Sequence, residues 1–172
     1  MGKLWQKLTK LDQDQEDKKL VLNFPVFKEL RSQDLEYLFK AGSVRSYLYN
    51  EIIFESEKPA MALHFVLSGS VGLYRQRKNE EMERFKYVKQ GECFGEEAVL
   101  QDKLRLFTAK ATEETKTFAI TSSELRIILS NKSRIAICLL YSIICSYQDQ
   151  LNTSEEELYA LTRKLTEANI IV

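Results

Sequence analysis

The most informative stretch of the chain reads Gly91-Glu92-Cys93-Phe94-Gly95-Glu96-Glu97-Ala98-Val99-Leu100, and Arg105 follows it closely. Its two glycines allow the backbone to approach a ligand. Backbone N–H groups at the start of a helical turn favour negative charge, and the forked guanidinium of arginine is a permanently charged partner for phosphate. The carboxylate of Glu96 can accept hydrogen bonds from a sugar hydroxyl. The stretch therefore predicts a clamp for a sugar phosphate.

This stretch resembles the phosphate-binding cassette of the cyclic nucleotide-binding domain, which the catabolite activator protein, the regulatory subunits of cyclic-AMP-dependent kinase and cyclic-nucleotide-gated channels share. That cassette reads approximately Phe-Gly-Glu-(Leu/Ile)-Ala-Leu, a short spacer, and Pro-Arg-small-Ala-(Thr/Ser). The chain matches it at Phe94, Gly95, Glu96, Ala98, Arg105 and Thr108. The resemblance implies that Arg105 pairs with the cyclic phosphate, Glu96 binds the ribose 2′-hydroxyl, and amides near Ala98 complete the cradle. The candidate ligand-binding residues are Gly95, Glu96, Glu97, Ala98, Arg105 and Leu106.

Several positions depart from the cassette. Glu97 replaces an apolar residue, Leu104 replaces the proline, and Leu106 and Phe107 replace small or hydroxylated residues. The changes remove a hydroxyl that would bond the phosphate and place two bulky side chains where the nucleotide would sit. A plainer interpretation also stays open, in which Glu96 lies on an exposed turn and Arg105 pairs with a nearby carboxylate on the surface.

The resemblance extends over residues 24–150. The family's Gly-Glu-hydrophobic run and its following Leu-Ser-Gly-x-Val hairpin have counterparts at residues 50–54 and 67–71. Asn50 stands where the family has a glycine, and asparagine adopts the left-handed backbone region at little cost. Glu57 replaces a second glycine, where we expect a larger strain. The resemblance implies a jelly-roll-like β-roll.

The order of elements predicts an α+β fold with three parts. A helical extension is expected over residues 1–22, from the spacing of Leu4, Trp5, Leu8 and Leu11. Residues 23–133 are expected to form the β-roll with flanking short helices, for which Ser32 and Ser123 are candidate caps. Strands are expected at residues 44–47, 51–54, 63–67, 70–74, 84–88, 107–112 and 115–121. Short strands at such spacing are typical of a sandwich or barrel.

Residues 134–172 are expected to form a long helix and a dimerisation segment. Its apolar residues recur in alternating four- and three-residue steps, as in a coiled coil, at Leu140, Ile144, Tyr147, Leu151, Leu158, Leu161 and Leu165. In an alternative, a second helix begins at a capping box, from Thr153 to Glu156 or from Ser154 to Glu157. The family resemblance implies that the long helix forms a homodimer interface and covers the base, where Gln150 is the nearest polar group by register.

Composition excludes several classes of protein. The 172 residues are 44% hydrophobic and carry 25 basic and 25 acidic side chains, so no overall field favours nucleic acid or a membrane surface. Cys93, Cys138 and Cys145 lack metal-ligand spacing and favour a cytoplasmic location. The apolar run 135–144 is too short to span a bilayer. The single histidine, His64, excludes a cupin-type metal enzyme, and residues 153–172 leave too little chain for a helix-turn-helix module.

Two functions stay open. The first is a stand-alone, non-enzymatic sensor of cyclic AMP or cyclic GMP that needs no cofactor or metal and acts as a homodimer on an unknown protein partner. The second is a degenerate β-roll that has lost its ligand and serves as a dimeric interaction module. If Arg105 is the only cation of the clamp, Arg105→Ala is expected to abolish nucleotide binding and leave the fold intact.

Overall fold

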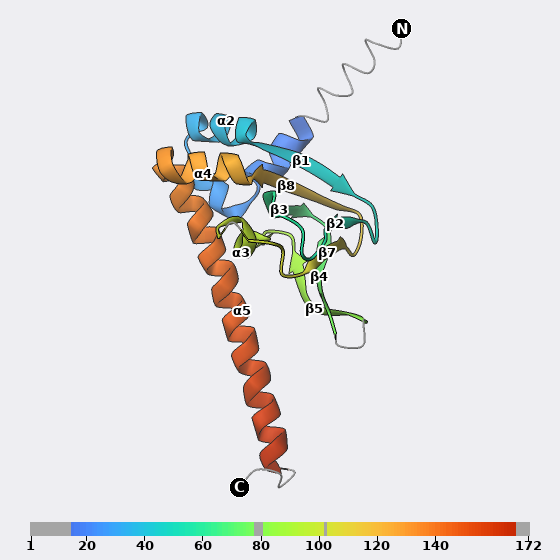
Figure 1. Cartoon of the computed structure of the whole chain (residues 1–172). Coiled ribbons are helices and arrows are strands. Elements are labelled where there is room, and N and C mark those ends of the chain that lie inside the picture. Colours follow the sequence, from blue (N-terminus) through green and yellow to red (C-terminus); the bar gives the residue numbers. More distant parts are fainter. Residues whose placement is uncertain (1–14, 78–80, 102, 168–172) are drawn as a thin grey trace.

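The computed structural model describes residues 15–77, 81–101 and 103–167 (Figure 1). Residues 15–22 are helical, and η1 (Pro25–Glu29) and α2 (Ser32–Ala41) follow. The apolar spacing of Leu4, Trp5, Leu8 and Leu11 lies outside the described residues. Pro25 opens η1, in agreement with the preference of proline for the first turn of a helix.

The described residues form two antiparallel four-stranded sheets, which pack as the predicted β-roll (Figure 1). The strands are β1 (Gly42–Tyr47), β2 (Ile52–Phe54), β3 (Ala62–Ser68), β4 (Ser70–Gln76), β5 (Met82–Lys89), β6 (Cys93–Phe94), β7 (Thr108–Ala111) and β8 (Thr115–Thr121). One sheet has the order β1-β8-β3-β6 and the other β2-β7-β4-β5. The predicted α+β class and β-roll are confirmed; the short strand β6, at the start of the cassette, is an addition.

Two turn residues hold the left-handed backbone that the sequence predicts. Asn50 has φ 65° and Glu57 has φ 62°. The turn at Glu57 is tied to the end of the cassette, because the Glu57 N–H donates to the Arg105 carbonyl and the Arg105 N–H donates to the Lys58 carbonyl, each at 2.8 Å. The strain at Glu57 is therefore offset by backbone hydrogen bonds that fix the position of Arg105.

The hydrophobic core has two parts. The larger part lies beneath the helices and includes Phe27, Phe65 and Phe118, whose rings pack edge to face. The smaller part lies inside the roll and consists of Val66, Val71, Leu73, Val88, Phe94, Phe107 and Ala109. The cassette borders this smaller core, so its loops rest on rigid packing.

The two predicted serine caps are both one or two residues away from the true cap positions. The helix α4 (Ser122–Asn131) is capped by Thr121, whose hydroxyl accepts a hydrogen bond from the Glu124 N–H, and not by Ser123. In α2 the N-cap position is Arg31 and Ser32 is already helical. The error at α4 arises because Thr121 and Ser123 carry equivalent hydroxyls, whereas at α2 the N-cap residue Arg31 makes no side-chain capping hydrogen bond.

The last described element is one continuous helix, α5 (Ser133–Glu167). The predicted long helix is confirmed, whereas the alternative of a separate helix beginning at Thr153 or Ser154 is wrong, since the Thr153 hydroxyl donates to the Asp149 carbonyl at 2.9 Å and stays within the helix. The first half packs on the roll through buried Ile135, Leu139 and Ile143, and the second half extends away from it (Figure 1). Among the described helices no single one is long and apolar enough to cross a bilayer; α4 and α5 pass that test only as a pair bent by 118°.

Candidate functional site

The cassette begins with a backbone turn that only glycine suits. After β6, Gly95 has φ 83° and precedes the short helix α3 (Glu96–Val99). A Cβ atom at Gly95 would lie 2.5 Å from Nη1 of Arg105. Gly95 is therefore required both by its left-handed conformation and by the close approach of the guanidinium.

Arg105 is buried, with 3% of its surface exposed. Its Nη1 donates to the Gly95 carbonyl at 2.6 Å and its Nη2 donates to the Ala62 carbonyl at 2.5 Å. The guanidinium carbon lies 3.8 Å from the centroid of the Phe54 ring. Two hydrogen bonds and a cation–π contact thus hold the guanidinium against the back of the cassette.

Glu96 and Glu97 are the carboxylates of α3. Glu96 is 8% exposed, so the interpretation of Glu96 and Arg105 as surface residues is wrong. Burial raises the pKa of Glu96, and burial together with the Glu96 charge raises the pKa of Glu97 to about 7. Tyr147 of α5 lines the same cavity as Glu96, and burial together with the charge of this carboxylate raises the pKa of Tyr147 to about 12. The cassette and α5 are therefore coupled electrostatically through this pair.

Three buried polar atoms of the cassette have no hydrogen-bond partner among the described residues. They are Oε2 of Glu96, Oε1 of Glu97 and Nε of Arg105. Buried polar groups in folded proteins are almost always paired, and each unpaired one costs about 1–3 kcal/mol. The cassette thus presents two acceptors and one charged donor without partners.

A cavity of about 140 Å³, here named the cassette cavity, lies between α3, the roll and α5. Its lining consists of Leu73, Arg75, Lys86, Cys93, Phe94, Gly95, Glu96, Glu97, Leu106, Phe107, Tyr147 and Gln150. Of the predicted site residues, Gly95, Glu96, Glu97 and Leu106 line it. Ala98 is fully buried, and Arg105 lines a neighbouring cavity of about 670 Å³.

Gln150 lies in the wall that α5 contributes to the cassette cavity. It accepts a hydrogen bond from Nζ of Lys86 on β5, at 3.3 Å. Lys86 and Arg75 are two cations of this cavity that the sequence did not reveal, so Arg105 is not the only cation near the cassette. No motif marks them, because strands distant in sequence bring them to the site.

The two bulky replacements of the cassette behave differently. Phe107 is 7% exposed and joins the smaller core, where its ring packs against Phe54 and Phe85. Leu106 lies at the rim and is largely exposed. Ligand cavities of proteins usually measure about 300–1,000 Å³, so the cassette cavity alone is too small for a whole nucleotide in this conformation.

Two other features of the structure do not take part in the cassette. His64 has its Nδ1 at 3.3 Å from the Thr117 hydroxyl, and burial lowers the pKa of His64 to about 3, so it is the neutral strand residue that the sequence suggests.

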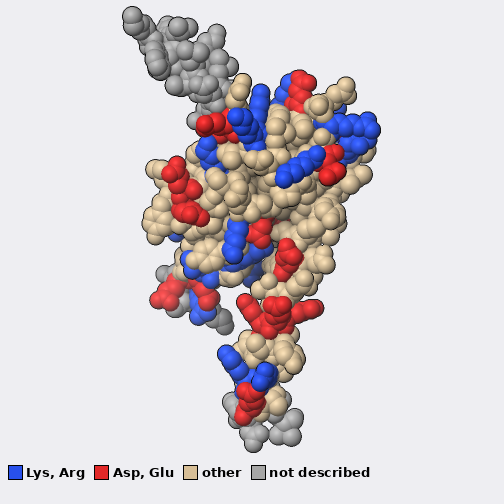
Figure 2. Space-filling view, turned by 180° about the vertical axis from the view of Figure 1, so that it is seen from behind, with Lys and Arg blue, Asp and Glu red and all other residues tan. Residues whose placement is uncertain are grey.

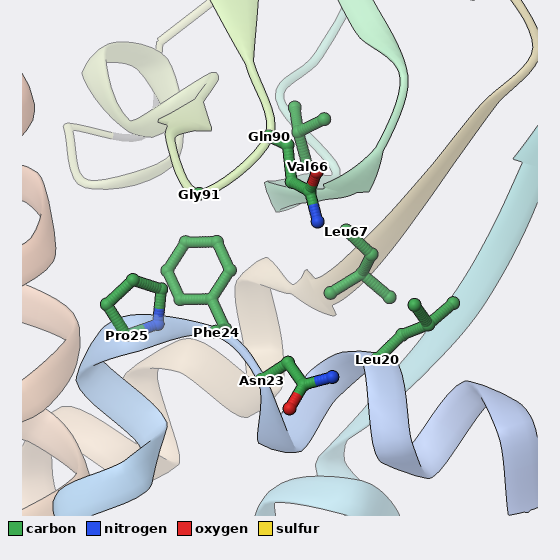
Figure 3. A pocket seen from close by; sticks show the side chains of 8 residues that line it. All are labelled: Leu20, Asn23, Phe24, Pro25, Val66, Leu67, Gln90 and Gly91. Atoms are coloured by element: carbon green, nitrogen blue, oxygen red, sulfur yellow. The ribbon is translucent and has the colours of Figure 1, made fainter.

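A separate cavity of about 220 Å³ lies between η1 and the turn after β5 (Figure 3). It is lined by Leu20, Asn23, Phe24, Pro25, Val66, Leu67, Gln90 and Gly91. Within the described ranges no cluster of His, Cys, Asp and Glu could hold a metal ion.

The family comparison agrees with this architecture. The sequence profile described as "Cyclic nucleotide-binding domain" matches residues 44–132, which is more than half of the chain. The chain belongs to the cyclic nucleotide-binding domain family. The profile spans the roll from β1 to the end of α4 and includes the entire cassette.

Individual relatives share the domain at low identity. A candidate potassium channel protein of Rhodopseudomonas palustris is 27% identical over 117 residues, which are 68% of this chain and 28% of that protein. A cyclic nucleotide-binding domain from Methylobacillus flagellatus has a TM-score of 0.70 at 15% identity, with 87% of this chain and 84% of that chain covered. The Thermus thermophilus catabolite activator protein has a TM-score of 0.63 at 24% identity, with 80% of this chain and 63% of that chain covered. These structures establish a shared fold.

Proposed function

We propose that this chain is a cyclic nucleotide sensor whose cassette binds the sugar phosphate of the ligand. The observation that carries the proposal is the set of three buried atoms without partners, on Glu96, Glu97 and Arg105. A cyclic nucleotide has complementary groups, because its phosphate accepts hydrogen bonds from a guanidinium and its 2′-hydroxyl donates one to a carboxylate. The family membership supports the same class of ligand.

Binding requires a rearrangement of groups that contact one another in this structure. Arg105 faces away from the cassette cavity and donates to the carbonyls of Gly95 and Ala62. To reach a phosphate at α3 the guanidinium has to give up at least one of these bonds. The Tyr147 side chain, which lines the cavity against Glu96, has to move with it. Ligand entry would thus change the contact between the cassette and α5.

The output surface that we propose is the exposed apolar face of α5. Ile144 and Leu151 are 61% and 62% exposed, and Leu140 and Tyr147 are partly exposed on the same side. Apolar stripes of this kind usually meet a second apolar surface. Pairing of α5 from two copies would bury the stripe in a symmetric homodimer. A protein partner would then bind differently to the dimer when the ligand changes the contact between the cassette and α5.

The sensor function is tested by calorimetric titration of the full chain with cyclic AMP and with cyclic GMP. We expect saturable binding of at least one nucleotide. The Arg105→Ala variant should lose binding by about 30-fold or more, since removing one partner of a desolvated charge pair costs about 2–5 kcal/mol. Arg77→Ala is the matched control, because Arg77 is an exposed arginine of the roll that pairs with Glu83. Equal affinity of Arg105→Ala and wild type would refute the role of the cassette.

The second candidate function is that of a dimeric interaction module without a nucleotide. The packing of Phe107 into the smaller core favours it, since this ring reduces the room next to the cassette. In that case neither cyclic nucleotide produces heat at millimolar concentration, while the dimer still forms. The same titration therefore separates the two functions.

A further inference from the structure

We propose that the site selects cyclic nucleotides with a 6-oxopurine base, such as guanine, over cyclic AMP, and that Lys86 with Gln150 makes this selection. The inference rests on the proposed sensor function and goes further by naming the class of base. The inference is based on the hydrogen-bond donors in the cavity wall opposite the cassette, which Lys86, Arg75 and Gln150 provide.

A groove next to the cassette cavity offers a place for the base. A groove of about 520 Å³, here named the outer groove, runs between β5 and α5 and shares Arg75, Lys86 and Gln150 with the cassette cavity. A nucleotide whose sugar phosphate occupies the cassette must extend into this groove, because about 140 Å³ cannot hold it entirely. The base therefore passes beside the hydrogen-bonded pair of Lys86 and Gln150.

Two of the three side chains that line both the cassette cavity and the outer groove, Lys86 and Arg75, are cations. Lysine and arginine have donors and no acceptor atom. The third is Gln150, whose Oε1 accepts from Nζ of Lys86, which leaves one lone pair of this oxygen and the amide NH₂ for a ligand. Arg75 lies over the ring of Phe85, with Cζ 4.5 Å from the ring centroid, and is thereby held beside the same passage.

The acceptors of the cassette cavity stand at its other end. The carboxylates there are those of Glu96 and Glu97, which both come from α3 and face the position of the sugar phosphate. Further carboxylates, those of Glu92, Asp149 and Glu157, line the outer groove but not the cassette cavity. Figure 2 shows that basic side chains form a band across the lower roll, and that acidic ones gather on α5 below it. The passage itself is thus basic.

Purine bases differ in what they present to such donors. Guanine and hypoxanthine carry two adjacent acceptors, O6 and N7, whereas adenine carries a donor, the 6-amino group, beside N7. Lysine bound to O6 and N7 is a common specific contact with guanine. With adenine, the ammonium of Lys86 would face the 6-amino group, which is also a donor, so that only N7 could accept from it. The wall therefore favours the 6-oxo base.

The test compares cyclic GMP, cyclic IMP and cyclic AMP by calorimetric titration of the wild-type chain. Cyclic IMP differs from cyclic AMP at the 6-position and lacks the 2-amino group of cyclic GMP. We expect cyclic GMP and cyclic IMP to bind about tenfold more tightly than cyclic AMP, or more, which corresponds to about 1.4 kcal/mol. Binding of cyclic AMP as tight as that of cyclic GMP overturns the inference but not the sensor function. If no nucleotide binds, the sensor function itself fails.

Two variants of Lys86 assign the selectivity to this side chain. Lys86→Gln supplies an acceptor beside a donor, which matches adenine, and should narrow or invert the preference. Lys86→Met removes the charge at similar length and should reduce cyclic GMP affinity more than cyclic AMP affinity. Lys110→Met is the control, since Lys110 lies on β7 of the same sheet and lines neither the cassette cavity nor the outer groove. An equal loss of both nucleotides in Lys86→Met would mean that Lys86 only attracts the phosphate, and would overturn the inference.

Discussion

Replacing Arg105 by alanine should destabilise the fold as well as weaken binding. The side chain makes two charge-assisted hydrogen bonds, to the carbonyls of Gly95 and Ala62, and lies over the Phe54 ring. Hydrogen bonds to charged groups contribute about 1.5–3 kcal/mol each and a cation–π contact about 1 kcal/mol, so together they stabilise by roughly 5 kcal/mol. This differs from the sequence-based expectation of an intact fold.

An opposing effect lowers that figure. The guanidinium is buried and its Nε has no partner among the described residues, and removing such a group relieves about 2 kcal/mol of desolvation. The expected net loss is therefore about 3 kcal/mol. For a chain of this size, 1 kcal/mol lowers the melting temperature by about 2–4 °C, so Arg105→Ala should melt about 6–12 °C below wild type.

Thermal unfolding followed by circular dichroism at the same protein concentration measures this difference. Arg77→Ala should melt within about 2 °C of wild type, because exposed ion pairs contribute about 0–1 kcal/mol. Arg105→Lys should lie between, since a lysine keeps the charge but cannot bond both carbonyls with a planar fork. If Arg105→Ala melts at the same temperature as wild type, the guanidinium does not hold Gly95 and the start of β3 in place, and the reasoning is refuted.

Two further predictions concern charge and assembly. Glu97 has a pKa of about 7 in the fold against 4.5 as its ordinary value, so the protonated form stabilises the fold fully below pH 4.5 and this stabilisation is lost as the pH rises through 7. The melting temperature of Glu97→Gln relative to wild type should therefore rise from pH 5 to pH 8, as scanning fluorimetry can follow; a difference that shrinks would contradict the burial of this carboxyl. In light scattering, Ile144→Glu with Leu151→Glu should give a soluble monomer while Leu48→Glu, on an exposed loop, stays dimeric; a wild-type monomer at roughly tens of micromolar would end the dimer hypothesis.

The local features of this fold could be predicted because they depend on nearby residues. The left-handed turns at Asn50 and Glu57, the glycine of the cassette and most strands follow from turn chemistry and alternation. The cap of α4 was predicted two residues too late, because Thr121 and Ser123 carry the same hydroxyl. The long helix α5 was predicted, but a break at Thr153 stayed open as an alternative, since the pattern that can start a helix there is equally compatible with a hydroxyl bonded inside one.

The composition of the site could be predicted only in part. Gly95, Glu96 and Glu97 were found from one contiguous motif, and they do line one cavity. The burial of Arg105 behind that motif depends on the carbonyl of Ala62, which is 43 residues away. Lys86 reaches the cavity only because β5 pairs with β4 and faces α5. Such contacts are decided by the packing of the whole roll, which no local pattern records.

One residue, Tyr147, belongs to both of the surfaces on which the proposed sensor depends. It lines the cassette cavity together with Glu96, and it is 39% exposed beside Leu140 and Leu151 on the apolar face of α5. A sugar hydroxyl that bonds to Glu96 competes with Tyr147 for the room beside this carboxylate. Displacement of Tyr147 would change the apolar face that a second copy meets. The coupling free energy between two binding events is the same in both directions. Dimerisation through α5 should therefore change the nucleotide affinity by the same factor by which the nucleotide changes the dimerisation constant.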